Sequence, residues 1–164
     1  RRGLPNIKSM VDAASALTTD KAVALFEKFG IFTKAELESR EEITYETYTK
    51  YINIEALTMI SMASKQILPA VISSVEAVGC DASVQKERLE AVTVELKAMN
   101  AALEKLKADQ ANGEKECAKC TAIYYHDIIM SDMAALRAPA DKLEMLVDKD
   151  FWPIPTYGDL LFEV

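Results

Sequence analysis

Two cysteines three positions apart, Cys117 and Cys120, form the pattern in this chain most typical of metal or redox chemistry. A zinc site needs two further ligands, and a thioredoxin-type site needs a strand before the helix. The remaining soft ligands are Cys80 and His126. On straight helices Cys80 lies about 40 Å from Cys117, and His126 is rotated about 120° and 180° from the two cysteines. We therefore expect helix-surface or core cysteines rather than a metal or redox site, although a helix start favours a thiolate and modest reactivity at Cys117.

The acidic residues between positions 41 and 55 are the next candidates for chemistry. Glu41, Glu42 and Glu46 lie in a segment dense in both charges, which is typical of a solvated helix face. Glu55 differs because apolar residues flank it, so we expect it to be buried at an interface and paired with a cation. The sole histidine, His126, is expected to be a partly buried helical residue. Packing explains three tyrosines in the same region, at positions 45, 48 and 51.

No glycine-rich phosphate loop occurs in the sequence. The residue types and their spacing therefore predict no catalytic, cofactor-binding or metal-binding residue in this chain.

Capping residues predict two short helices near the start of the chain. Ser9 is expected to begin one that runs through Leu17, and Thr19 to cap a second from about Asp20 to Lys28. Gly30 follows at the position where a left-handed glycine commonly ends a helix.

A long helix is expected to follow. Thr33 and Glu36 form a capping box, and helical character continues from there to about Val78. Pro69 should kink this helix rather than end it, because the apolar periodicity resumes beyond it.

Two further long helices are expected, with a turn at Gly79–Asp81 and a cap at Ser83 before the first. The first ends at Asn112–Gly113, and the second runs from about Glu114 to Asp148, with a bend at Pro139. Because the connection is short, they must lie antiparallel, each about 40–50 Å long. The first carries an apolar seam with alternating spacings of three and four: Leu89, Val92, Leu96, Met99, Leu103 and Leu106. The second carries a matching stripe: Tyr125, Ile129, Met133, Leu136, Ala140, Leu143 and Val147.

The last fourteen residues, 151–164, are predicted to form an extended tail rather than a helix. Pro153 and Pro155 remove two backbone donors and favour extended geometry before them, and Gly158 offers a turn. The segment is too apolar for a solvated end, so it should dock on its own helices, on a larger protein or on a neighbouring subunit. We expect its anchors to be Trp152, Tyr157, Leu160 and Phe162.

The fold class expected is all-α: an up-down-up bundle of long, partly kinked helices, preceded by short helices and followed by an extended tail. The expected division is 1–32 as a junction with short helices, 33–150 as the bundle and 151–164 as the tail.

Composition narrows the classes of partner. The chain has 164 residues and a formal net charge of −7 with mixed signs throughout, which argues against nucleic acid. Its apolar runs are shorter than a bilayer requires, so no membrane association is expected. Three cysteines make no disulfide framework, which indicates a reducing compartment. The chain begins at Arg1 without a methionine, which we interpret as a piece of a longer protein.

Several segments, in order, resemble the C-terminal region of type III glutamine synthetases. The more specific ones contain the sequences Asn-Ile-Glu-Ala-Leu-Thr-Met and Pro-Thr-Tyr-Gly-Asp-Leu-Leu-Phe. The matching segments are 2–6, 25–33, 35–40, 52–60, 67–71 and 152–162, whereas residues 81–125 match only as a charged helical hairpin. The cysteine pair is not part of the resemblance.

The resemblance implies a cytoplasmic parent enzyme that joins ammonia to glutamate with ATP and Mg²⁺ or Mn²⁺. Its catalytic residues would lie in an upstream catalytic domain, so no role is assigned to Arg1 or Arg2, and this segment alone should be inactive. It also implies a ringed homo-oligomer, commonly two stacked hexamers (a dodecamer), in which this segment supports the catalytic domain, oligomer assembly or both. The alternative is a free-standing helical interaction module whose apolar seam binds a partner helix.

Overall fold

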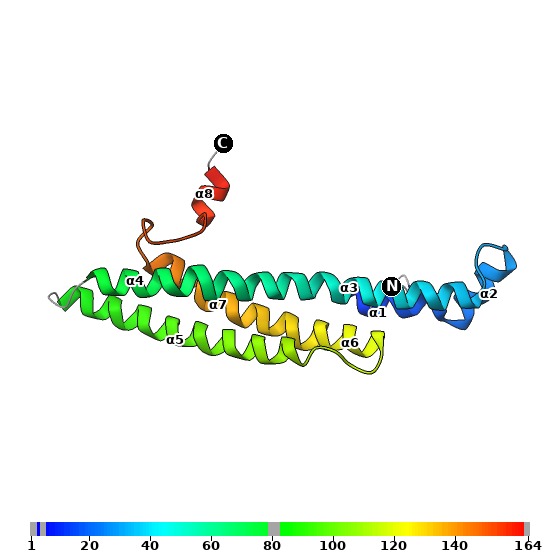
Figure 1. Cartoon of the computed structure of the whole chain (residues 1–164). Coiled ribbons are helices and arrows are strands. Elements are labelled where there is room, and N and C mark those ends of the chain that lie inside the picture. Colours follow the sequence, from blue (N-terminus) through cyan, green and yellow to red (C-terminus); the bar gives the residue numbers. More distant parts are fainter. Residues whose placement is uncertain (1–2, 4–5, 79–82, 163–164) are drawn as a thin grey trace. The chain divides into compact units, whose positions relative to one another are not determined.

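The computed structural model describes residue 3 and residues 6–78 and 83–162, without the side chains of residues 78 and 83–85. Within these ranges every regular element is helical, so the predicted all-α class is confirmed (Figure 1). The predicted turn at Gly79–Asp81 lies outside the described residues, as does the side chain of Ser83 that was expected to cap the next helix.

The chain divides into two compact units. Unit 1 contains Arg1–Ile54 and Gly113–Ile128, and unit 2 contains Glu55–Asn112 and Ile129–Val164. Helix α3 (Lys34–Met62) contributes residues to both units. The division expected from the sequence, at residues 32/33 and 150/151, stays a prediction.

Unit 1 begins with the short helices that the caps predicted. They are α1 (Met10–Ala14), the 3₁₀ turn η1 (Ser15–Thr18) and α2 (Asp20–Lys28). The Ser9 side chain accepts from the Asp12 amide at 3.0 Å, and Thr19 caps α2 in the same way. Gly30 has a φ of +64°, the left-handed conformation expected after a helix.

The capping box at the start of α3 is also confirmed. The Thr33 amide donates to the Glu36 carboxylate at 2.8 Å, while the Glu36 amide donates to the Thr33 hydroxyl at 3.4 Å. Helix α6 (Ala118–Tyr124) completes the unit and contacts α1. Their shared core consists of Val11, Ala14, Tyr45 and Ala122, with Tyr48 and Ala118 packed against it.

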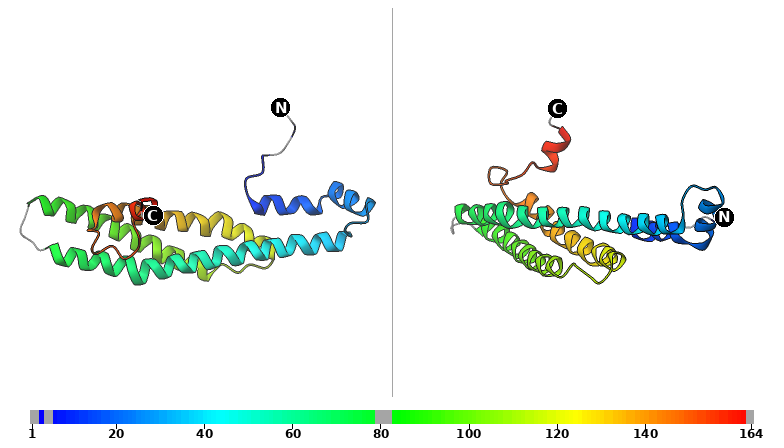
Figure 2. Two further views of the ribbon diagram at one scale, coloured as in Figure 1. Left: turned by 90° about the horizontal axis from the view of Figure 1, so that it is seen from above. Right: turned by 45° about the vertical axis from the view of Figure 1, so that its right-hand side comes forward.

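Unit 2 contains the up-down-up arrangement. The end of α3 continues through the π-helical turn η2 (Ala63–Ile67) into α4 (Leu68–Val78), then come α5 (Ser83–Ala111) and α7 (Met130–Leu146). Helix α5 packs on both α4 and α7, and Figure 2 shows the chain reversing direction between successive helices. The predicted seam faces this contact, since Val92, Met99, Leu103 and Leu106 of α5 and Leu136 and Leu143 of α7 are buried.

Both prolines expected to distort long helices lie within helices. The five-residue π turn η2 ends directly before α4, in which Pro69 is the second residue. Pro69 has no amide donor, and its ring crowds the carbonyl four positions earlier. A wider π turn before Pro69 relieves this crowding. A second π turn, η3 (Tyr125–Ile129), precedes α7 and was not predicted; Pro139 is buried inside α7.

One helix of the described chain is long and apolar enough to cross a membrane by length and composition. It is Lys34–Ala77, which contains an 18-residue window of mean hydropathy 1.2. No such stretch was expected, because the uninterrupted apolar runs of the sequence are short. A single helix of this kind is weak evidence for a membrane, since core helices of soluble proteins meet the same criterion. In unit 2 it buries Ala56, Ala63, Ile67 and Val71.

The prediction that the tail contains no helix was wrong for its second half. Residues 151–156 are not helical, as the prolines required, but α8 (Tyr157–Phe162) follows them. Gly158 lies inside this helix and has no positive φ, so it is not the expected turn residue. The physical reason is a second capping box, Thr156-Tyr-Gly-Asp159, which begins a helix immediately after the last proline.

Candidate functional site

The C-terminal tail and the α7 face beneath it form the candidate functional site of unit 2. Helix α7 ends at Leu146, and the following turn is closed by bonds from the amides of Phe151 and Trp152 to the carbonyls of Asp148 and Lys149, at 3.0 and 3.1 Å. The Trp152 side chain is only 8% exposed. The non-helical segment is therefore fixed at one end by a buried aromatic ring.

Asp159 holds the start of α8. Its carboxylate accepts from the Thr156 amide at 3.0 Å and from the Thr156 hydroxyl at 2.8 Å, and the Asp159 amide donates back to that hydroxyl at 3.2 Å. The Lys149 ammonium also donates to Asp159, across the loop between α7 and α8. The bond from Lys149, together with those from Thr156, lowers the pKa of Asp159 to about 2.

Tyr157 connects α8 to α7 through three groups. Its amide donates to Glu144 Oε1 at 2.9 Å, and its hydroxyl donates to Asp141 Oδ1 at 3.0 Å. The Arg137 guanidinium donates to the same hydroxyl and lies 5.8 Å from the ring centroid. These partners are spaced along one face of α7 at helical intervals of three and four, so that face presents all of them to Tyr157.

A largely apolar cavity of about 550 Å³ lies between the tail and the helices of unit 2. Methionines from several helices line it, and flexible thioethers suit an irregular surface. Glu55, which was expected to be buried at an interface, is instead exposed at this cavity. Its pairing with a cation stays a prediction. The lining includes Met59, Met62, Met99, Met133, Trp152 and Leu160.

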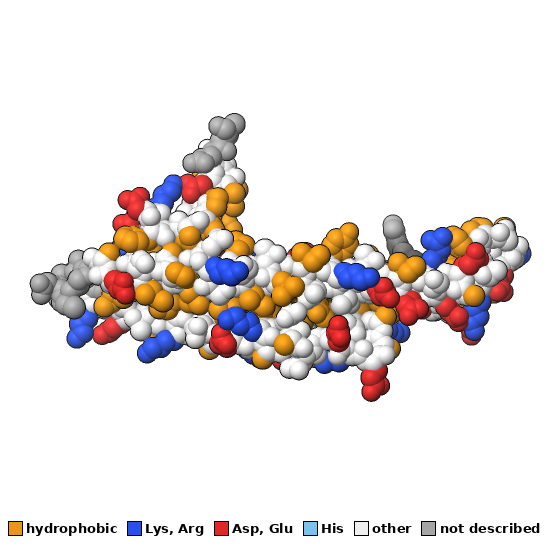
Figure 3. All heavy atoms as spheres, viewed as in Figure 1, with side chains coloured by type: hydrophobic (Ala, Val, Ile, Leu, Met, Phe, Trp, Pro, Cys, Tyr) orange, Lys and Arg blue, Asp and Glu red, His pale blue; other side chains and the backbone are white. Residues whose placement is uncertain are grey.

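The structure separates the four proposed anchors into two kinds. Trp152 is buried, and Tyr157 is 44% exposed but hydrogen-bonded to α7. Leu160 and Phe162 are 68% and 82% exposed, as is their neighbour Leu161 at 73%. Hydrophobic side chains are visible on the surface of the tail in Figure 3. The first pair holds the tail to its own helices, and the second pair presents apolar surface outward.

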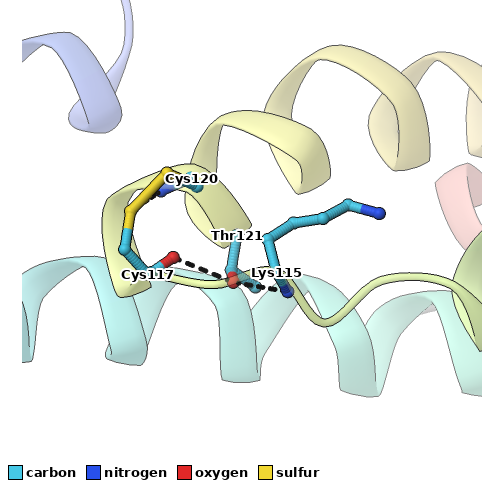
Figure 4. Close-up of a disulfide and its surroundings, with 4 residues drawn as sticks. All are labelled: Lys115, Cys117, Cys120 and Thr121. Atoms are coloured by element: carbon cyan, nitrogen blue, oxygen red, sulfur yellow. Dashed lines mark hydrogen bonds between the residues drawn. A yellow bond between two sulfur atoms is a disulfide. The ribbon is translucent and has the colours of Figure 1, made fainter.

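Cys117 and Cys120 were expected to be helix-surface or core cysteines, and no bond between them was predicted. Cys117 and Cys120 are joined by a disulfide at the start of α6, with their Cα atoms 5.2 Å apart (Figure 4). The sequence contained the signal, because three residues of helical spacing bring two cysteines within bonding reach.

Glu41 does not lie on a solvated face as expected. Its carboxylate accepts from the Thr18 hydroxyl at 2.6 Å and from the Tyr45 hydroxyl at 2.7 Å, inside unit 1. Burial alone would raise the pKa of Glu41, but these two bonds outweigh it and lower the pKa. Burial and the bond to Glu41 raise the pKa of Tyr45 to about 12. The cluster is a satisfied core network of a kind that stabilises packing.

His126 is partly exposed in η3, and its Nδ1 lies 2.7 Å from Asp127 Oδ1. Among the described residues, no three histidine, cysteine, aspartate or glutamate side chains gather in a way that could hold a metal ion. The Mg²⁺ or Mn²⁺ implied for the parent enzyme therefore has no cluster of three such side chains in the described part of this chain.

Residues 1–86 match the family model described as the glutamine synthetase C-terminal domain. Over its full length the chain is 34% identical to a glutamine synthetase of Butyrivibrio fibrisolvens, covering 25% of that protein. It is 29% identical to the type-3 glutamine synthetase of Dictyostelium discoideum, with 98% of this chain and 24% of that protein aligned. A glutamine synthetase of Bacteroides fragilis is 27% identical over 99% of this chain and 25% of its own length. The chain spans about a quarter of the length of the curated relatives it matches.

Proposed function

Because this chain belongs to the glutamine synthetase family, in which it matches the C-terminal domain, we propose that it is a helical, non-catalytic domain of a type III enzyme. Its role is to support the catalytic domain and the assembly of the oligomer. The observation that carries this proposal is a tail fixed to α7 through Tyr157 that leaves Leu160, Leu161 and Phe162 exposed.

The reaction belongs to the intact protein. We propose that it joins ammonia to glutamate with ATP and Mg²⁺ or Mn²⁺ in the cytoplasm, using an upstream catalytic domain and without nucleic acid or membrane as a partner. The relatives support this, since they are about four times as long as the matched part. The clusters of this chain support its non-catalytic role, because Glu41 and Asp159 have structural partners that account for their shifted pKa values.

The exposed end of α8 is the proposed docking surface for the rest of a ringed homo-oligomer. Three large apolar side chains on a six-residue helix are costly to leave in water. The contacts of Tyr157 and Asp159 fix this helix in place, so its end is presented on a pre-ordered support rather than on a loose terminus.

The test is a truncation of the intact protein after Asp150, followed by measurement of oligomer mass, thermal stability and glutamine formation. A loss of mass would place the docking contact on another subunit, and a loss of thermal stability at unchanged mass would place it on the protein's own catalytic domain. Full retention of mass, stability and activity would contradict the proposal. The control replaces Val94 and Met145, two exposed apolar residues outside the tail, by alanine. This variant should keep oligomer mass, thermal stability and activity if the effect is specific to the tail.

The second candidate is a free-standing interaction module that binds a partner helix through the α5 seam. In unit 2 this seam is already buried against α7. A partner helix would therefore have to displace α7 in order to bind the seam. Cross-linking of this chain to a helical partner, combined with hydrogen exchange at the amides of Leu103 and Leu106, separates the two functions. If a partner is cross-linked while the protection of these amides is unchanged, the partner binds somewhere other than the α5 seam, and the module function is contradicted.

A further inference from the structure

We propose that Cys117 and Cys120 form a reversible dithiol–disulfide site that exchanges with external thiols. The proposal rests on unit 1 alone and is independent of the glutamine synthetase assignment. Both residues are exposed at the start of α6, so a thiol in solution can approach the bond (Figure 4).

The bond closes a loop of only four residues, which limits its value as a structural cross-link. In the chain-entropy account, stabilisation by a disulfide grows with the length of the loop that it closes. Cys117 is the N-cap of α6 and Cys120 lies in its first turn, so the helix itself keeps the two residues close. The position therefore favours a bond whose formation and reduction change the fold little.

Hydrogen bonds that do not involve sulfur hold the same corner in place. The Thr121 hydroxyl accepts from the Lys115 amide at 3.2 Å and donates to the Cys117 carbonyl at 3.1 Å. The Thr121 amide donates to that carbonyl at 2.9 Å. Because these bonds survive reduction, the two thiols stay close enough to form the disulfide again.

The two sulfurs have different surroundings. Cys117 Sγ accepts a hydrogen bond of 3.0 Å from the Cys120 amide, which stabilises a thiolate on Cys117. Cys120 instead lines a shallow surface hollow of about 820 Å³ together with Lys115, Ile123 and Tyr124. An incoming thiol therefore meets Cys120, and Cys117 is the better leaving group.

An external thiolate attacks Cys120 Sγ, the bond between the two cysteines breaks, and Cys117 leaves as a thiolate that takes up a proton. A second external thiolate then attacks the external sulfur of the mixed disulfide and releases Cys120 as a thiolate, which is protonated in turn. The protein disulfide is reduced to two thiols while two external thiols are oxidised to one disulfide, and the reverse sequence restores the bond.

The test uses the intact protein that contains this chain, in glutathione buffers of varied ratio of reduced to oxidised form. After acid quenching and alkylation, cleavage after glutamate releases both cysteines in one peptide, residues 117–144. We expect this peptide to pass from disulfide to two alkylated thiols along one two-electron curve, and to retrace the curve on reoxidation. A pair that stays oxidised in excess reduced glutathione, or reduced in excess oxidised glutathione, while circular dichroism shows a folded protein, would overturn the proposal.

The Cys117→Ser variant tests whether Cys117 resolves a mixed disulfide on Cys120. In Cys117→Ser, Cys120 should accumulate as a lasting mixed disulfide with glutathione, whereas in the unsubstituted protein this species should be lost because Cys117 resolves it. Equal persistence of the mixed disulfide in the two proteins would contradict the assigned roles. Cys80→Ser is the matched control and should leave the curve of the 117–144 peptide unchanged.

Discussion

The hydroxyl of Tyr157 donates a 3.0 Å hydrogen bond to the Asp141 carboxylate, which ties the first residue of α8 to the middle of α7. Arg137, one helical turn earlier, donates to the same hydroxyl. Tyr157 thus holds the tail through hydrogen bonds, and Trp152 holds it through burial of an apolar ring.

Replacing Tyr157 by phenylalanine removes the hydroxyl and keeps the ring. We expect the free energy of tail opening to fall by about 0.5–1 kcal/mol, the lower part of the usual range for a hydrogen bond, because the side chain is partly exposed. Hydrogen exchange of the amides of residues 160–162 measures this opening. Tyr51→Phe, on an exposed ring of α3, is the matched control; an equal effect of the two variants would contradict the fastening role.

Acid should release the tail through Asp159. Its pKa is about 2 in the folded state against an ordinary value of 3.8, so the folded state binds its proton less readily than the unfolded state does. This contribution to stability is present above about pH 4 and is lost as the pH falls towards 2. The emission of Trp152, the sole tryptophan of this chain, reports the transition. In Asp159→Asn the contribution should be absent at neutral pH, and an unchanged acid transition in that variant would contradict the assignment.

Trp152 should contribute more to tail docking than its neighbour. Truncation of a buried tryptophan to alanine costs about 3–5 kcal/mol in well-packed sites, and the lower end applies here because the tail can detach. Phe151→Ala, at an exposed ring beside it, should cost less than half as much. Chemical denaturation of the two variants, followed by circular dichroism, checks the order, and a larger effect for Phe151 would contradict it.

Asp132 should destabilise unit 2 when it is ionised. Burial raises its pKa, and the ion pair with Lys105, which works in the opposite direction, does not fully offset that effect. A raised carboxyl pKa means that stability is fully present below the unfolded pKa of about 4 and declines as the pH rises through the folded value. Asp132→Asn should therefore be at least as stable as the original chain at pH 7, by urea denaturation. Hydrogen bonds from Lys105 to Asp109 and to Asp132 raise the pKa of Lys105, so the pairing with Asp132 also favours the ionised carboxylate. A clear loss of stability in the variant would mean that this pairing outweighs burial.

Local signals in the sequence were sufficient for much of the fold. The cap at Thr19, the box at Thr33 and Glu36 and the alternating seam from Leu89 to Leu106 each depend on neighbours within one or two turns, and the structure has all of them. The helix at 157–162 was missed because two prolines were given more weight than the Thr156–Asp159 box, although a proline disfavours helix only at and before its own position.

Contacts between distant segments could not be read from spacing. Tyr157 meets Arg137 and Asp141 only because the chain reverses after α7, and Glu41 meets Thr18 across the loop between α2 and α3. Each pair joins polar residues that look solvent-exposed in their own helices, so helical periodicity assigns them to a surface.

The measurement closest to the central claim is the oligomer mass and glutamine-forming activity of the intact protein carrying Leu160→Ala, Leu161→Ala and Phe162→Ala. These changes leave Trp152, Tyr157 and Asp159 in place, so the tail should stay on α7 while its exposed apolar surface is removed. We expect the unsubstituted intact protein to form glutamine. We expect the variant to have lower activity, together with a reduced oligomer mass or a reduced thermal stability. A variant that matches its parent in mass, stability and activity would contradict the docking role of the tail, and a well-folded parent that forms no glutamine would contradict the proposed enzyme.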